Sequence, residues 1–583
     1  GDVYKRQVIY DSLMVSLNSD GTISRRHHRL VALFTDDGIR RYGDPRILFN
    51  SEHQKLNVEI ARVYMRDGTI VDTQKNGFNQ TTPFTLVSAW DFTSWQEMVV
   101  THVGIEKGCL AELCYTIKDR EKFYPSLSGS IVFHGDDPIQ LRVFRVTVPD
   151  GLELKHLERN GTPEPSISDD GRVLTWKMEN LEPGAREKGL APWEEYLPVV
   201  YYSTEGSWED VSMRIATWFS KAVESWSYTD EVFGSDESEK ENDELVRLAH
   251  TKALSLVRSV KVPFDEFCFA PRNAERVYRS GYASSFERAV LLGSILREEG
   301  FEPHVVLVSK GPFVPDDVPT LSCFGGIALA VPIEGSLLIV DPSESFERDI
   351  RLLNQYGVFL HCGYGDVLER GLEVDPHRNK TIMHLSMKLE NGELSCDATA
   401  EMDGAFSPYW LIKGTGHEFL DYLDEKVEGL FEDALLLRWS IARLEPEHVK
   451  IGFGFSVPSL FEESDDRVYI DLLVPLEMDV SGVNRLNTSI SKVSAPFYLL
   501  PCEMEVDVDF TVPDGWHVVA LPSACEMNNG HSILEVEVSQ EGSRVKVFRS
   551  LRINSSTIEP DQYRHYREAL FRFTRSRLVL ERD

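Results

Sequence analysis

Several signatures of familiar chemistry are missing from this sequence of 583 residues. No two of its eight cysteines form a C-x-x-C pair, so zinc knuckles, thioredoxin-type redox pairs and a dense disulfide scaffold have no support. The sequence also contains no G-x-x-x-x-G-K-S/T loop, no G-x-G-x-x-G turn and no H-E-x-x-H pair. Nucleotide-binding and zinc-hydrolase functions are therefore not indicated, and we expect neither a cofactor nor a metal ion.

Positive charge is also scarce. The chain has 61 Lys and Arg residues against 94 Asp and Glu residues, which gives a formal net charge of -33 at pH 7. A surface of this sign repels the phosphates of nucleic acids and the head groups of anionic lipids, so we expect neither as a main partner. Part of the charge lies in the segment 229–244, which is typical of a solvated acidic loop.

The chain has no long uninterrupted apolar run. Its most apolar window extends from Cys323 to Val340 and is interrupted by Pro332, Glu334 and Gly335. These residues separate IALAV from SLLIV, so the window predicts two buried strands joined by a tight turn. We expect no transmembrane segment in this stretch of sequence.

The periodicity of the apolar residues divides the chain into three parts. From residue 8 to about 200, short alternating runs are separated by Asp-Gly pairs, which is typical of β-sandwiches. Helical periodicity begins at 204 with EGSWEDVSMRIATWFSKAVESW, and strand patterning returns near 378. We predict a multidomain α+β protein with a β-sandwich-like N-terminal domain (1–203), a central α/β core (204–372) and a β-sandwich-like C-terminal domain (373–583). The last domain should contain one helical insertion, HEFLDYLDEKVEGLFEDALLLRWSI, and should end in a short helix and a strand.

The two outer parts share a short sequence echo. TVPDG occurs at 147–151 and again at 511–515, each time after an apolar strand and before a second strand pair. Because V-P-D-G is a common entry to a turn, five identical residues are a weak signal. The echo is consistent with two similar β modules on either side of the central part.

The central part contains a specific succession of elements. Ser284 is followed three places later by Glu287, a capping box that opens the helix SFERAVLLGSILREE. This helix is apolar almost all round, so we expect it to be buried. Gly300 ends it, FEPHVVLVS follows as a strand, and a later strand ends in V-D-P at Asp341.

With this succession the chain resembles the transglutaminase-like superfamily, whose fold is shared with papain-type cysteine enzymes. It is most similar to bacterial exported proteins in which a β-rich domain of unknown function precedes the core and another β domain follows. The resemblance also covers GIRRYGDPRILFNSEHQKLNVEIARVYMRDGTIVDT near the start and TIEPDQYRHYREALFRF near the end. It implies a papain/transglutaminase-like central core with a Cys-His-Asp triad, in which the Cys begins the buried helix and the His and Asp lie on two adjacent strands.

The positions that match the triad do not carry its residues. Alignment on Glu287 and the residues after it places Ser285 at the nucleophile position, and Gly326 in CFGGIALAV stands at the His position. Only Asp341 matches. A serine hydroxyl is a poor nucleophile unless a base takes its proton, and Gly326 has no side chain to do so. The hypothesis that follows is a degenerate transglutaminase-like protein without catalysis.

Other interpretations of the same residues remain open. An acyl-transferase or peptidase-like hydrolase could use Ser285 or a displaced cysteine, for which Cys268 and Cys323 are the candidates, although each lies in an apolar run typical of a buried inert thiol. Ser285 could equally be an ordinary residue of the first helical turn, and the core could be purely architectural. His304, on the strand after the helix, is expected to be a satisfied core histidine.

The role and location that follow are binding or scaffolding at the cell envelope, with a protein, peptide or glycan as ligand. The family resemblance implies a periplasmic or secreted protein. The chain begins with GDVYKRQ and enters strand-like sequence at once, so we expect a fragment whose true N-terminus, with any signal peptide, is missing. The sequence leaves the oligomeric state and the disulfide state open.

Overall fold

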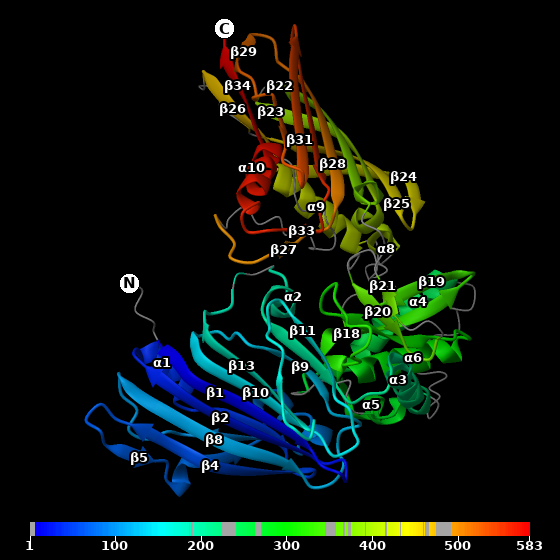
Figure 1. The fold of residues 1–583 in the computed structure, drawn as a ribbon. Coiled ribbons are helices and arrows are strands. Elements are labelled where there is room, and N and C mark those ends of the chain that lie inside the picture. Colours follow the sequence, from blue (N-terminus) through cyan, green and yellow to red (C-terminus); the bar gives the residue numbers. More distant parts are fainter. Residues whose placement is uncertain are drawn as a thin grey trace. The chain divides into compact units, whose positions relative to one another are not determined.

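The computed structural model describes residues 6–185, 187, 190–223, 241–262, 270–343, 357–364, 368–370, 375–390, 392–413, 417–431, 433–458, 460, 466–473 and 491–583. The chain is strand-rich and multidomain (Figure 1). Contacts divide it into two compact units, the first comprising residues 1–186, 192–345 and 357–370, and the second 187–191, 346–356 and 371–583. The division into three domains at residues 203 and 372 stays a prediction.

An eight-stranded sheet dominates the N-terminal part of the first unit. Its order is β12-β13-β10-β1-β2-β8-β4-β5. The pair β1 (Arg6–Leu17) and β10 (Ile139–Thr147) is parallel, and the other neighbours are antiparallel. The remaining strands are β2 (Ile23–Leu33), β4 (Gln54–Tyr64), β5 (Ile70–Asp72), β8 (Cys109–Asp119), β12 (Ser166–Ile167) and β13 (Val173–Leu181).

Two three-stranded sheets cover one face of this large sheet. One consists of β11 (Lys155–Arg159), β14 (Val199–Ser203) and β9 (Ser128–Val132), and the other of β3 (Arg46–Asn50), β7 (Trp95–Val100) and β6 (Phe78–Thr81). Cys109 and Ala111 of β8 lie in the buried cluster that includes residues of β14, and Ile117 of the same strand lies in the buried cluster that includes residues of β3 and β7. Because alternate residues of a strand share one face, both small sheets lie on the same side. The short helices here are α1 (Asp36–Tyr42), α2 (Trp193–Tyr196) and the 3-10 turns η1 (Lys75–Gly77), η2 (Phe84–Leu86) and η3 (Trp90–Phe92).

The rest of the first unit combines helices with a five-stranded antiparallel sheet. The helices are α3 (Trp208–Val223), α4 (Asn242–Leu256), α5 (Ala274–Ser280) and α6 (Ser285–Glu298). The sheet order is β19-β18-β17-β20-β21, with β17 (His304–Ser309), η5 (Leu321–Cys323), β18 (Phe324–Ile333), β19 (Ser336–Val340), β20 (Val358–His361) and β21 (Leu368–Arg370) along the chain. A short parallel pair joins β15 (Arg258–Ser259) to β16 (Tyr282–Ala283).

Two predictions about this region are confirmed. Helix α6 is buried from Phe286 to Leu296, and its capping box is formed. The apolar window between Cys323 and Val340 is a hairpin of β18 and β19, whose turn residues Glu334 and Gly335 both have positive φ. Within the ranges described above, no helix is long and apolar enough to cross a bilayer.

The second unit is built on another eight-stranded sheet. Its order is β24-β25-β23-β22-β28-β32-β31-β30. The strands are β22 (Lys380–Glu390), β23 (Glu393–Asp403), β24 (Leu435–Glu445), β25 (His448–Val457), β28 (Cys502–Thr511), β30 (Cys525–Asn528), β31 (Ser532–Glu541) and β32 (Arg544–Ile553). Its core is covered by α9 (His417–Leu430), α10 (Tyr563–Thr574) and a sheet of β26 (Arg467–Leu473), β34 (Arg575–Arg582) and β29 (Trp516–Ala520). Smaller elements are η6 (Pro376–Arg378), η7 (Gly404–Phe406), α8 (Tyr409–Ile412) and the pair β27 (Phe497–Tyr498) and β33 (Thr557–Ile558).

One secondary-structure prediction in this unit is wrong in part. The sequence pattern predicts a helical insertion that continues through Ile441, but the helix ends at Leu430 and Leu435–Glu445 is strand β24. The reason is tertiary: β24 pairs with β25 along its length, and that pairing outweighs the helical preference of the leucines. The predicted closing helix and strand are confirmed as α10 and β34.

The TVPDG echo corresponds to a repeated arrangement of strands. In the first unit β1 pairs in parallel with β10, which pairs antiparallel with β13; in the second β22 pairs in parallel with β28, which pairs antiparallel with β32. Thr147 and Thr511 end the two equivalent strands, and Gly151 and Gly515 in the turns that follow both have φ of 77°. The short sequence match therefore marks equivalent turns in two similarly connected sheets.

Candidate functional site

The N-terminus of α6 is where the sequence places the nucleophile position. The Ser284 hydroxyl accepts a hydrogen bond from the Glu287 N–H at 3.4 Å, and the Ser284 N–H donates to Glu287 Oε2 at 2.9 Å. Ser285 is the first residue of the helix and is partly exposed. Among the residues that the structure describes, no histidine nitrogen is hydrogen-bonded to its hydroxyl. Within that part of the chain, Ser285 therefore lacks a hydrogen-bonded histidine.

The structure places Gly326 and Asp341 in the β18–β19 region of the five-stranded sheet. Gly326 is in β18, and Asp341 directly follows β19, which pairs with β18 in a register that joins Leu329 to Val340. The Asp341 carboxylate accepts from the backbone N–H and the hydroxyl of Ser343, at 2.7 and 2.6 Å. The Asp341 carboxylate is thus hydrogen-bonded within a local turn, and the glycine at position 326 has no imidazole that this carboxylate could orient.

Two buried polar residues that contact the segment around Asp341 could not be identified from the sequence. His250 of α4 donates from Nε2 to the Asp341 carbonyl oxygen at 2.6 Å, and burial lowers its pKa although this bond acts in the opposite direction. Arg288 of α6 donates to the Ser343 carbonyl at 2.9 Å and to the Val257 carbonyl at 3.2 Å. These side chains attach the segment after β19 to α4 and α6. Nothing in their local sequence distinguishes them from ordinary helix residues.

Cys323, one of the two candidate replacement nucleophiles, lies in the described part of the chain. Cys323 is 6% exposed, and burial raises the pKa of its thiol well above the usual value. A thiol kept protonated in this way is unreactive. Cys268, the other candidate, lies outside the described residues, as do residues 229–240 of the predicted acidic loop.

The N-terminus of α6 is joined to the N-terminal part of the unit by an ion-pair network around Arg272. Arg272 donates to Glu287 Oε1 and Oε2 at 2.6 and 2.9 Å and also pairs with Asp91. The Glu287 side chain is 2% exposed, so its charge depends on this guanidinium. Burial raises the pKa of Asp91, but bonds from Arg276 and Tyr282 and the charge of Arg272 outweigh it and the pKa falls. Glu287 is thus a structural anchor of the α6 N-terminus.

A row of three titratable side chains crosses the five-stranded sheet. His304 Nε2 lies 3.0 Å from His361 Nδ1, and His361 Nε2 lies 2.7 Å from Glu369 Oε2. The register pairs Val306 with His361, and Phe359 with Glu369, so the three residues occupy diagonal positions on one face of β17, β20 and β21. His304 is buried as predicted but is not satisfied, because its Nδ1 has no hydrogen-bond partner in the described part of the chain. It borders a cavity of about 590 Å³ at the C-terminal end of α6, with Tyr364 stacked on its ring.

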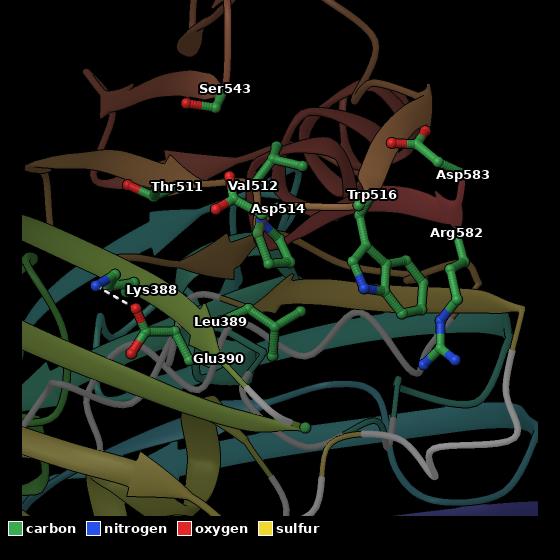
Figure 2. Close-up of a pocket in the computed structure, with 13 residues that line it drawn as sticks. Lys388, Leu389, Glu390, Thr511, Val512, Asp514, Trp516, Ser543, Arg582 and Asp583 are labelled. Carbon is green, nitrogen blue, oxygen red and sulfur yellow. Dashed lines mark ion pairs between the residues drawn. The ribbon is translucent and has the colours of Figure 1, made fainter.

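A larger and more polar cavity, of about 930 Å³, lies in the second unit. It is formed by residues 388–390 and 392 of the β22–β23 hairpin, the TVPDG turn, Trp516, Ser543, Arg582 and Asp583. Figure 2 shows the Trp516 ring and the Arg582 side chain lying side by side, with the guanidinium carbon 5.0 Å from the ring centroid. Lys388 and Glu390 form an ion pair on the opposite side. An aromatic ring surrounded by charged donors and acceptors can hold a polar ligand by stacking and hydrogen bonds together.

Sequence-family models match two parts of the chain. Residues 19–185 match DUF3857, and residues 473–576 match DUF3858, both domains of unknown function. A search of curated proteins gives no match.

Solved structures resemble the chain in fold. A crystal structure from Parabacteroides distasonis, described as a "putative protease", aligns over 99% of both chains with a TM-score of 0.70 and 18% identity. Yeast LTA4 hydrolase aligns over 34% of this chain and 29% of its own, with 8% identity and a TM-score of 0.18. An M1 zinc metallopeptidase from Deinococcus radiodurans aligns over 34% and 42%, with 14% identity and a TM-score of 0.17. Only the first of these matches carries a statement about fold.

Proposed function

We propose that this chain is a transglutaminase-like protein that has lost its catalytic chemistry and acts by binding or scaffolding. The proposal depends on the residues observed at positions 285 and 326. The hydroxyl at the start of α6 has no histidine partner among the described residues, and the strand position that should supply one is a glycine. Without a base, neither acyl transfer nor amide hydrolysis through Ser285 has a route for the proton.

The competing proposal is an acyl-transferase or peptidase-like hydrolase. The description of the Parabacteroides distasonis structure favours it, although the likeness extends only to fold. Such an enzyme would use Ser285 or a displaced cysteine. A purely architectural core is the third proposal, and it predicts that neither ligands nor substrates act at the α6 terminus.

The first test is an activity comparison. The purified chain should release no more ammonia or amine from glutamine-containing and peptide substrates than buffer does, and S285A should behave as the parent does. Turnover that disappears in S285A would overturn the proposal in favour of the enzyme.

The second test rebuilds the missing groups. A Cβ atom on Gly326 would lie 3.5 Å from Val308 Cβ, an ordinary contact, so a larger side chain can begin there without displacing the backbone. We expect S285C/G326H to react with iodoacetamide faster at neutral pH than S285C alone, because an imidazole near a helix N-terminus lowers the pKa of a thiol. The triple variant S285C/G326H/D341N is the matched control and should lose part of the gain. Equal reactivity of S285C and S285C/G326H would argue against the transglutaminase-like placement of these positions.

For the ligand, we propose a peptide or glycan of the cell envelope, and the polar cavity beside Trp516 supports this choice. Oligosaccharide and peptide arrays probed with the whole chain should give binding that W516A reduces by about tenfold or more. A periplasmic or secreted location is part of the same proposal. Fractionation of cells that express the full-length gene tests it, and a wholly cytoplasmic pool would contradict it.

A further inference from the structure

Three large apolar side chains occur at every third position between η2 and η3. Phe84, Val87 and Trp90 are 92%, 59% and 79% exposed. Leu86 and Ala89, which lie between them, are 0% exposed. Single exposed apolar residues are normal on a protein surface, but three in regular succession, two of them large aromatics, are not.

The backbone explains this regular succession. Leu86 N–H donates to the Pro83 carbonyl, Ala89 N–H to the Leu86 carbonyl and Phe92 N–H to the Ala89 carbonyl, each at 2.9 Å. These i→i+3 bonds form a ribbon of successive turns, in which η2 and η3 are 3-10 and Ala89 between them has a non-helical backbone with φ of -118° and ψ of 79°. In a 3-10 turn, residues three apart share a face, and the burial of Leu86 and Ala89 shows that the spacing is kept across the ribbon. One face of the ribbon carries Phe84, Val87 and Trp90, and the opposite face is buried.

The ribbon is held in place from below. Leu86 and Ala89 belong to a buried cluster with Trp95, Val260 and Tyr282. At its end, the Asp91 N–H donates to the Tyr282 hydroxyl at 2.8 Å, and the Asp91 carboxylate is paired with Arg272 and Arg276. Side chains on so well anchored a segment lose little further freedom on binding, which favours affinity.

Two arginines lie beside the ribbon. The exposed Arg258 donates to the Ser88 carbonyl, and Arg276, whose side chain is 64% exposed, pairs with Asp91. On a molecule with a net charge of -33, two guanidiniums thus border the apolar row, and the bond from Arg258 goes to a backbone carbonyl rather than to a carboxylate. A complementary surface would be apolar with carboxylates at its margin.

We propose that the row of Phe84, Val87 and Trp90 is a docking surface for an acidic partner protein, which contributes a segment of apolar residues flanked by Asp or Glu. Trp90 and Phe84 are the anchors, and Arg258 and Arg276 set the charge preference. This surface goes beyond the loss of chemistry proposed for Ser285, because docking here requires nothing of positions 285, 326 or 341. The two proposals can therefore fail separately.

The test uses a random peptide library displayed on phage and selected against the whole chain. We expect enriched peptides to combine aromatic or aliphatic residues with Asp or Glu. Synthetic copies should bind F84S and W90S at least about tenfold more weakly than the parent, as for aromatic anchors of interfaces. R276Q should weaken binding less and should reduce its dependence on salt.

A substitution of an exposed residue in the second unit provides the control. L437S removes a side chain that is 64% exposed in the second unit and should bind as the parent does. Unchanged unfolding midpoints show that the variants are folded. Failure to enrich any peptide, or peptides that bind W90S and the parent equally, would overturn the proposal. So would a Trp90-dependent interaction of another kind, either with phosphatidylcholine and phosphatidylglycerol vesicles or as self-association in analytical ultracentrifugation.

Discussion

His304 and His361 share one hydrogen bond of 3.0 Å, from Nε2 of the first ring to Nδ1 of the second. The direction of this bond follows from Glu369, whose carboxylate can only accept and so receives the proton of His361 Nε2. In the neutral pair, His361 Nδ1 then accepts from His304, and Nδ1 of His304 keeps a bare lone pair. A proton that binds to either ring therefore places a positive charge in a buried position, which costs free energy.

This arrangement predicts a loss of stability in acid. Burial, together with the nearby His361, lowers the pKa of His304 from 6.5 to about 4. Because the folded value lies below the unfolded one, the unfolded chain binds the proton more readily. The stabilisation that the neutral His304 contributes to the folded state is complete above about pH 6.5, and it is lost as the pH falls toward about 4. The loss due to His304 should be at most about 3 kcal/mol.

Urea unfolding of the parent and of H304Q across this pH range measures the effect. H304Q should show a smaller decrease in the free energy of unfolding than the parent. His102 and His250 also have pKa values lowered by burial, so the difference between proteins is the informative quantity. H384Q, which changes an exposed histidine, should decline as the parent does. A decline in H304Q as large as that of the parent would contradict the prediction.

Arg272 should contribute more to stability than its neighbour Arg276, although both bind Asp91. R272M leaves the carboxylate of Glu287 buried without its cation, and we expect the free energy of unfolding to fall by about 3 kcal/mol or more. R276M removes a partner that is 64% exposed and leaves Asp91 paired with Arg272, so it should cost less than about 1 kcal/mol. Chemical denaturation of the two variants makes the comparison, and equal losses would show that the network does not depend on burial.

The glycine at position 326 should be dispensable for folding. A methyl group there meets Val308 at 3.5 Å, whereas one on Gly293 of α6 would lie 2.6 Å from Phe219 Cζ. We expect G326A to change the free energy of unfolding by less than about 0.5 kcal/mol and G293A to cost about 1–3 kcal/mol through overpacking. Thermal or urea unfolding distinguishes them. A large loss in G326A would mean that the fold itself excludes a side chain at position 326.

The two TVPDG turns should respond alike to the same change. Gly151 and Gly515 have φ of 77°, and no atom lies within 4 Å of a Cβ built on either. The cost of G151A and of G515A is thus one of backbone conformation alone, about 1–2 kcal/mol each. Calorimetry of both variants tests the equivalence. If one substitution were neutral and the other costly, the turns would not be equivalent.

Local features of the fold could be predicted from sequence because their causes are local. The Ser284–Glu287 capping box, the buried α6 and the Glu334–Gly335 turn each depend on a few neighbouring residues. The leucines of strand β24 suit helix or strand equally, and only their pairing with β25 decides between the two. The assignment of Ser285, Gly326 and Asp341 to triad positions stays a prediction, and the sequence did not indicate that the Asp341 carboxylate accepts hydrogen bonds from Ser343, two residues away.

Contacts between distant residues could not be predicted in this way. Asp91 and Arg272 are 181 residues apart, and His304 and His361 are 57 residues apart, with no periodicity that relates them. Their meeting depends on strand register and on how the parts of the first unit pack. The 84–90 row is an intermediate case, since its three-residue spacing is visible in the sequence but its exposure is not.

The parallel strand pairs have a consequence for synthesis on the ribosome. Val8 pairs with Ile139, and Lys380 with Glu503, so each pair joins strands about 120–130 residues apart. At a translation rate of about 5–20 residues per second, roughly 6–26 seconds pass between the synthesis of β1 or β22 and the synthesis of its parallel partner. During that interval each nascent sheet has an open hydrogen-bonding edge at its centre, where apolar strands aggregate most readily. A chaperone that protects exposed strand edges should therefore raise the yield of this protein at two separate points of its translation.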